Sequence, residues 1–241
     1  MSNTFDFRRA MQEAQGQALV GPNVIRNALP FLGGGLVLTA MGVYGGLGVM
    51  SNYPQAFMPT FWVALIGNLV LFFVSRGVAE RGNNETALPL LGLYSLLSGY
   101  TLSAIIFMAL STSGVGVQGI GIAALGCGVT FMAARPIGSN LSDEDGMALT
   151  KTVQLGLIAL VVVLVGQLLF SFFGVITPSW LEVGISSMGV LLFAGMAVVD
   201  FYLLPRTYRD DQYLPAALSM YLTYINLFIF ILRLLIALNR E

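Results

Sequence analysis

Seven apolar segments, each long enough to cross a lipid bilayer, limit what this sequence can fold into. A spanning helix needs about 20 mostly apolar residues. The segments lie at residues 28–50, 59–79, 87–111, 115–134, 149–174, 182–204 and 214–237. Only 10% of the residues are charged, against roughly 25% in soluble domains. The sequence therefore predicts an all-α polytopic membrane protein with seven transmembrane helices in the bilayer.

The connections between the segments are short, so we expect one membrane domain and no extramembrane catalytic domain. Residues 1–27 form a cytoplasmic N-terminal tail in this interpretation, and residues 28–241 form the seven-helix membrane domain. The tail lacks the apolar core and small-residue cleavage site of a signal peptide. We therefore expect the first spanning helix to direct insertion.

Basic residues mark one side of the membrane. Nine of the 11 Lys and Arg residues fall in the N-terminal tail or near the second, fourth and sixth connections. The first, third and fifth connections, SNYPQAFMP, TSGVGVQG and VITPSW, contain none. Since cytoplasmic loops are enriched in Lys and Arg, we expect the N-terminus inside and the C-terminus outside. The short loops favour a bacterial inner membrane, with a eukaryotic internal membrane as the alternative.

The composition excludes several classes of function. One cysteine and no histidine argue against disulfide frameworks, His-dependent triads and typical zinc sites. A net charge of −1 argues against a nucleic-acid partner, and no pattern indicates a cofactor. An intramembrane aspartyl protease needs two membrane aspartates, whereas Asp200 has no second one. We expect that the protein is not an enzyme.

Two spacings predict local structure. Gly42 and Gly46 have the small-xxx-small spacing of closely packed helices. Tight packing is the simpler interpretation, and movement of the glycine-rich first and fourth helices is the alternative. Ser142 and Asp145 have the spacing of a helix-capping pair, so we expect Ser142 to cap the fifth helix.

A polar stripe runs along the last segment. At roughly 100° per residue, its four members share an arc of about 80° on a helix. They are Ser219, Thr223, Asn226 and Arg233. Because unpaired polar groups are costly in hydrocarbon, the stripe predicts a central last helix whose polar face meets other helices or water.

Asp200, near the cytoplasmic end of the sixth segment, needs a partner. A carboxylate at this depth is costly unless it is protonated, paired or hydrated. One interpretation is that Asp200 anchors the helix end at the membrane surface. The other is that it lines a polar path with the stripe. Arg76, at similar depth on the second segment, is its expected partner in the second interpretation and a positive-inside anchor in the first.

Three motifs carry a family resemblance. They are LPAALSMYLTYINLFIFILRLL at 214–235, LLFAGMAVVDFYLLPR at 191–206 and LLSGYTLSAIIF at 96–107. In this order they resemble the seventh, sixth and third helices of the Bax inhibitor-1-like family, also called transmembrane Bax inhibitor motif proteins. Seven spans with the N-terminus inside also agree. The chain is identified as a bacterial-type member of that family.

The resemblance implies a slow, pH-sensitive calcium leak through a protein in which six helices surround the last. In that family an aspartate on the sixth helix and one on the seventh form a paired sensor, and an arginine on the second helix can lock the closed state. Asp200 and Arg76 match two of these positions, whereas Thr223 replaces the second aspartate. Calcium prefers several oxygen ligands, so Asp200 with Thr223 and Asn226 would be a weak calcium site and no stronger metal site is expected.

We therefore expect a pH-sensitive calcium or cation leak channel with an incomplete di-aspartyl sensor, whose partners are Ca²⁺ or protons. Two close carboxylates share a proton because both cannot be charged cheaply. Thr223 removes that repulsion, so we expect a changed or absent proton response. The alternative is a non-conducting membrane protein that binds and modulates membrane proteases or other protein complexes.

Overall fold

A computed structural model describes residues 19–81, 84–174 and 177–239, except for the side chains of residues 76, 79, 80 and 172. In this part of the chain there are seven helices and no strand. The helices are α2 (Val24–Asn52), α3 (Pro54–Glu80), α4 (Asn84–Ser111), α5 (Gly116–Ser139), α6 (Asp143–Phe172), α7 (Ser179–Thr207) and α8 (Tyr213–Leu238). All seven are long and apolar enough to cross a membrane, which confirms the expected fold class.

Several helices extend beyond their apolar segments. Helix α2 begins at Val24, so it includes the last residues of the expected tail, and α6 begins at Asp143. The acidic residues of DED thus form the first turn of α6, where the helix dipole favours negative charge. Residues 1–18 of the expected tail lie outside the described residues.

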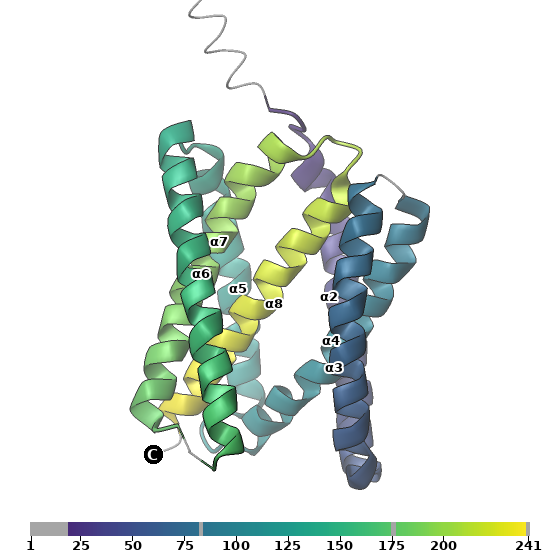
Figure 1. Ribbon diagram of the computed structural model, residues 1–241, viewed down its shortest axis with the longest axis vertical. Helices are drawn as coiled ribbons and strands as arrows, with labels where there is room; N and C mark the ends of the chain where they lie inside the picture. The colour runs from purple at the N-terminus through teal and green to yellow at the C-terminus, as the bar shows by residue number, and fades with distance from the viewer. Residues whose placement is uncertain (1–18, 82–83, 175–176, 240–241) are drawn as a thin grey trace, which may run out of the picture.

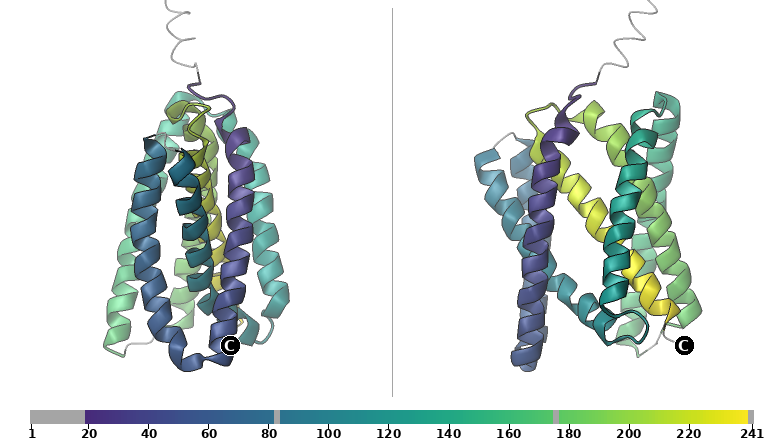
Figure 2. Two further views of the ribbon diagram at one scale, coloured as in Figure 1. Left: turned by 90° about the vertical axis from the view of Figure 1, so that its right-hand side faces the viewer. Right: turned by 180° about the vertical axis from the view of Figure 1, so that it is seen from behind.

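The helices form two groups of three with α8 between them. Helices α2, α3 and α4 pack together on one side of the molecule, and α7 packs against α5 and α6 on the other (Figure 1). Helix α8 crosses diagonally between the groups, as Figure 2 shows from behind. It contacts α2, α3, α4, α5 and α7, and Phe230 shares a buried cluster with Leu160 of α6. The expected central position of the last helix is confirmed.

The N-terminal end of α2 and the connection from α7 to α8 lie at one end of the molecule, together with the connection from α5 to α6 (Figure 1). We call this the basic end, because these are the segments near which the sequence places its Lys and Arg residues. The C-terminal end of α8 lies at the opposite end. That the basic end faces the cytoplasm stays a prediction from the positive-inside rule.

Glycines allow α2 and α4 to pack closely. A Cβ atom added at Gly42 would overlap the carbonyl oxygen of Leu96, and one at Gly46 would overlap the Ser103 side chain. The backbones can approach only because these positions carry no side chain. The expected tight packing at Gly42 and Gly46 is confirmed.

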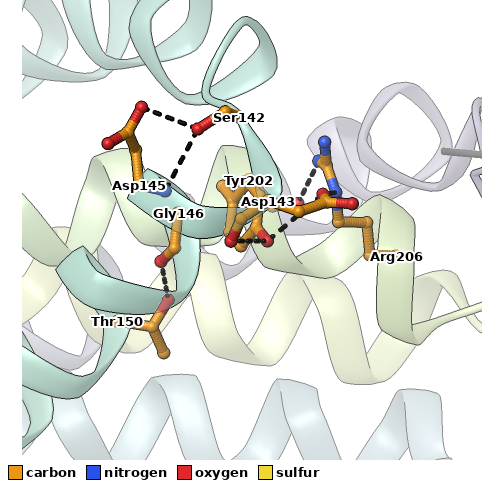
Figure 3. Close-up of polar contacts among 7 residues, drawn as sticks. All are labelled: Ser142, Asp143, Asp145, Gly146, Thr150, Tyr202 and Arg206. Carbon is orange, nitrogen blue, oxygen red and sulfur yellow. Dashed lines mark hydrogen bonds and ion pairs between the residues drawn. The ribbon is translucent and has the colours of Figure 1, made fainter. Parts of the chain in front are cut away.

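Ser142 caps α6 at the basic end, as expected. The Asp145 N–H donates to Ser142 Oγ at 3.1 Å, and the Ser142 hydroxyl donates to the Asp145 carboxylate at 2.6 Å (Figure 3). The cap satisfies a backbone donor that the first turn leaves without an intrahelical partner.

The first turn of α6 also holds the end of α7. The Tyr202 hydroxyl donates to the Asp143 carbonyl oxygen at 3.2 Å, and Arg206 pairs with the Asp143 carboxylate at 3.2 Å (Figure 3). The Arg206 guanidinium lies 4.1 Å from the centre of the Tyr202 ring. Gly146 leaves room for that ring, since a Cβ atom there would overlap it. These contacts hold the C-terminal end of α7, close to Asp200, against the first turn of α6.

The connection from α7 to α8 holds the beginning of α2. Asp210 accepts from the Asn23 backbone N–H at 2.7 Å and from the Asn23 side-chain amide at 3.1 Å. The Asn27 side chain donates to the Asp210 carbonyl oxygen at 3.1 Å. The basic end is therefore tied together by polar contacts between segments far apart in the sequence.

Candidate functional site

Asp200 lies on α7 inside the helix bundle, about two turns before the helix ends at the basic end. The residue is 2% exposed. The Ser219 hydroxyl donates to Asp200 Oδ1 at 2.8 Å, and the Thr223 hydroxyl donates to Oδ2 at 2.6 Å. Each carboxylate oxygen therefore accepts a hydrogen bond from α8, which lowers the cost of burying the group.

The spacing of the two donors follows from helix geometry. Ser219 and Thr223 are one turn apart on the same face of α8, so both can reach one carboxylate on the neighbouring helix. Thr223 is 2% exposed and occupies the position where the family resemblance expects the second aspartate. The structure places it directly on Asp200.

The far end of the polar stripe meets the other acidic residue of α7. Arg233 donates to Glu182 Oε1 at 3.3 Å and to Oε2 at 3.4 Å, and the two side chains are 24% and 22% exposed. Glu182 and Asp200 are about five helical turns apart and hence on one face of α7. The stripe therefore faces α7 at both ends, as an inward orientation requires.

The Glu182–Arg233 pair was not predicted from the sequence. The signal that could have found it is the spacing of the two acids by a whole number of turns. Ser219 was predicted as part of the stripe but not as a hydrogen-bond donor to Asp200.

Two predicted site residues are not seen at the carboxylate. The Asn226 side chain donates to the Leu222 carbonyl oxygen within α8, at 2.8 Å. Arg76 belongs to α3, and its side chain lies outside the described part of the chain. The structure thus brings together Asp200 and Thr223, adds Ser219, and leaves the roles of Arg76 and Asn226 as predictions.

A cavity of about 180 Å³ lies beside the two hydroxyl donors. Ser219 and Thr223 line it, with Tyr208 and Pro215 toward the basic end and Phe193 toward the middle of the span. Its other walls are apolar: Phe72, Leu157, Met196, Leu218 and Leu222. The cavity therefore extends from the basic end past the donors of Asp200 into the bundle.

The oxygen atoms around Asp200 are fewer than a tight cation site needs. In the described part of the chain, no three Asp, Glu, Cys or His side chains converge to form a metal site. Tight calcium sites supply six to eight oxygen ligands, whereas this site offers one carboxylate and two hydroxyls.

The other side of α8 is bonded to the first helix group. The Tyr221 and Thr39 hydroxyl oxygens are 2.6 Å apart, and the Thr39 hydroxyl also lies 3.1 Å from the Ser95 carbonyl oxygen. Tyr221 is 1% exposed and Thr39 is 4% exposed. Helix α8 is therefore held by buried hydrogen bonds on both sides, to α7 and to α2.

An exposed ion pair lies outside the span, in the connection from α7 to α8. Arg209 Nε and Asp211 Oδ1 are 3.1 Å apart. The hydrogen bond from the Arg209 guanidinium holds the pKa of the Asp211 carboxyl below its usual range. Asp211 is therefore charged throughout the physiological pH range.

Known proteins resemble this chain over most of its length. The family described as "Inhibitor of apoptosis-promoting Bax1" matches residues 21–240. An uncharacterized membrane protein of Streptococcus pyogenes serotype M6 is 33% identical over 195 residues, covering 78% of this chain and 77% of the relative. An uncharacterized protein of Helicobacter pylori strain J99 is 28% identical over 214 residues, covering 88% and 85%. These bacterial relatives and the seven apolar helices identify a multi-pass integral membrane protein of bacteria.

Proposed function

Because the chain belongs to the Bax inhibitor-1-like family, we propose that it is a cation leak protein whose path passes the Asp200 carboxylate. Calcium is the proposed ion, as the family resemblance implies. The observation that carries the proposal is a buried carboxylate, bonded by Ser219 and Thr223, beside a cavity that extends from the basic end. The proposal assigns no catalytic reaction to the chain.

The position of Asp200 supports this role on energetic grounds. An ionisable residue inside a membrane span is costly, and it marks an ion or proton pathway more often than a structural contact. Its two hydroxyl partners are neutral, so they stabilise a negative charge without cancelling it. A negative charge that remains beside a cavity attracts cations and repels anions.

A pH response of the leak would act through the same group. An ionised carboxylate only accepts hydrogen bonds, whereas a protonated one also carries a donor. Protonation of Asp200 would therefore leave Ser219 and Thr223 to compete for fewer acceptor sites and would loosen the contact of α7 with α8. It would also remove the charge that attracts the cation.

The test is calcium flux into liposomes that contain the purified protein and a trapped calcium dye. We expect flux above that of protein-free liposomes, with a dependence on pH between about 5 and 8. Asp200→Asn should lower the flux by roughly tenfold, as expected when a desolvated charge is neutralised, and should flatten the pH profile. Glu144→Gln is the matched control, because it removes an exposed carboxylate at the basic end.

Absence of flux at every pH, or equal flux for wild type and Asp200→Asn, would overturn the proposal. Absence of flux together with stable co-purification of a second membrane protein would favour the non-conducting alternative. A Glu144→Gln variant as impaired as Asp200→Asn would show that the effect is one of surface charge and not of the buried site.

A further inference from the structure

Two stacked aromatic rings interrupt the polar contact between α7 and α8. The ring centroids of Phe193 and Phe230 are 5.5 Å apart, with an angle of 23° between the ring planes. Phe230 is 4% exposed. Phe193 lies midway along α7 and lines the cavity beside Ser219 and Thr223. On α7, Phe193 is therefore the cavity-lining residue farthest from the basic end.

The ring pair lies on the faces that carry the polar groups. At roughly 100° per residue, Phe230 falls inside the arc of the polar stripe on α8, between Thr223 and Arg233 along the helix. Phe193 falls within about 20° of Asp200 and Glu182 on α7 by the same measure. The two facing surfaces therefore share one order: polar, aromatic, polar.

Phe230 packs against α7 at a glycine, Gly189. A Cβ atom added at Gly189 would overlap Phe230 Cδ1 and its neighbouring ring atoms. Glycine at this position lets the ring approach the α7 backbone next to Phe193. The Phe230 ring thus contacts both the α7 backbone at Gly189 and the Phe193 ring.

Polar groups resume on the far side of the ring pair. Ser186 is 0% exposed, and its hydroxyl has no hydrogen-bond partner among the described residues. It lies on the same face of α7 as Phe193, about two turns closer to Glu182. The Glu182–Arg233 pair then follows at the far end. A buried polar position therefore lies behind the rings, away from the cavity.

We propose that Phe193 and Phe230 form an aromatic constriction that separates the cavity at Asp200 from the polar groups at Ser186 and Glu182, and that it limits cation permeation. This inference rests on the proposed leak function. Apolar constrictions close ion paths by excluding water, and a hydrated cation has no ligand between two stacked phenyl rings. Displacement of α8 from α7 separates the rings and joins the two polar regions.

Thiol accessibility tests the constriction without requiring flux. Ser186→Cys is introduced together with Cys127→Ser, which removes the native thiol, and inverted and right-side-out membrane vesicles are treated with a membrane-impermeant cationic methanethiosulfonate. From the basic end, Cys at position 186 should be unreactive when both rings are present. Adding Phe230→Ala should raise its labelling rate by about tenfold, whereas Phe170→Ala, which removes a 62% exposed ring, should not.

Calcium flux in liposomes gives the second measurement. Phe230→Ala should increase flux by about tenfold relative to wild type, Phe230→Leu should increase it less, and Phe170→Ala should leave it unchanged. The double variant Phe230→Ala with Asp200→Asn should return to low flux, because an opened path would still pass Asp200. Retention of a large anionic dye by the same liposomes checks that the protein has not become a non-selective hole.

Equal labelling with and without Phe230 would overturn the constriction, whether or not the protein conducts. So would wild-type flux that Phe230→Ala leaves unchanged. Absence of flux from all variants, together with ring-dependent labelling, would instead reject the leak function while retaining the barrier. The Phe230→Leu variant keeps most of the buried volume, so a loss of folding in Phe230→Ala leaves a second variant that decides the question.

Discussion

The hydroxyl of Thr223 donates a hydrogen bond to Asp200. A second carboxylate at this position could do so only if it were protonated. An ionised carboxylate offers acceptors alone, so two of them cannot lie at the 2.6 Å that separates Thr223 Oγ1 from Asp200 Oδ2 unless one is protonated. Ser219 supplies a second donor from one turn earlier on α8. The site is therefore satisfied with a single acid.

Thr223→Asp should make stability depend on pH. Near pH 5 the two carboxylates can share a proton, whereas near pH 8 that proton is lost and the two negative charges repel each other. We expect the Tm of the variant in detergent to fall relative to wild type as pH rises from about 5 to about 8, by roughly 3–6 °C. Thr223→Asn is the control of similar size without the charge. A pH profile parallel to that of Thr223→Asn would show that the two acids are not close.

Site residues could be predicted from the sequence where the pattern that marks them lies within one helix. The high cost of a carboxylate in a membrane span identified Asp200, and helical periodicity identified the face of α8 that carries Thr223. Periodicity gives the direction of a side chain but not the residue opposite it. Ser219 at Asp200 and Glu182 at Arg233 follow from the crossing of two helices, which no single segment encodes.

At the scale of helices, the closest packing in the first group is between α2 and α4. It depends on positions where a helix presents backbone and not side chain. Gly42 faces the Leu96 carbonyl oxygen, while Gly45 has open space around it. Both are glycines within α2, so the sequence alone does not tell which one packs against α4.

Gly42→Ala should lower the Tm, and Gly45→Ala should not. The added methyl group at Gly42 would force α2 and α4 apart, at a cost of about 1–3 kcal/mol for overpacking. At Gly45 the methyl group meets no neighbour, and alanine is the better helix former by roughly 1 kcal/mol in water. Thermal unfolding of the two variants in the same detergent measures the difference. Equal Tm values would mean that the backbone contact at Gly42 does not hold the helices together.

Helix number and helix ends had different sources in the sequence. Hydropathy predicted all seven spans because a bilayer requires about 20 apolar residues in each. It could not predict that α6 begins at Asp143, since that end is set by the Ser142 cap and by the contacts of Asp143 with Tyr202 and Arg206. Polar contacts at the basic end extend the helices beyond their apolar segments.

For the whole molecule, α8 is the element that connects the two helix groups. Tyr221 bonds it to Thr39 of α2, while Ser219 and Thr223 bond it to Asp200 of α7. These contacts are buried or partly buried, whereas the Arg209–Asp211 ion pair at the basic end is exposed. Buried and exposed contacts should respond differently to pH.

Asp211→Asn should leave the pH profile of any calcium flux unchanged. The Arg209 guanidinium lowers the pKa of Asp211 from the usual 3.8, so the stability that its charge contributes is present above that value and is lost only as pH falls through the lowered pKa. Between about pH 5 and 8 the group does not titrate. A profile measured with the variant that shifts within this window would assign the proton response to the exposed connection and not to Asp200.

Helix α8 is attached to α7 by a buried contact near one end and by a partly exposed contact near the other. Near the basic end two hydroxyl groups hold it on Asp200, which is 2% exposed. At the other end Arg233 and Glu182 are partly exposed, and salt weakens such pairs. The Arg233 end of α8 is therefore the more weakly held end. Phe230, about two turns from Thr223, lies toward that end. Since salt screens the partly exposed Glu182–Arg233 pair, ionic strength should affect the Arg233 end of α8 more than the contact at Asp200.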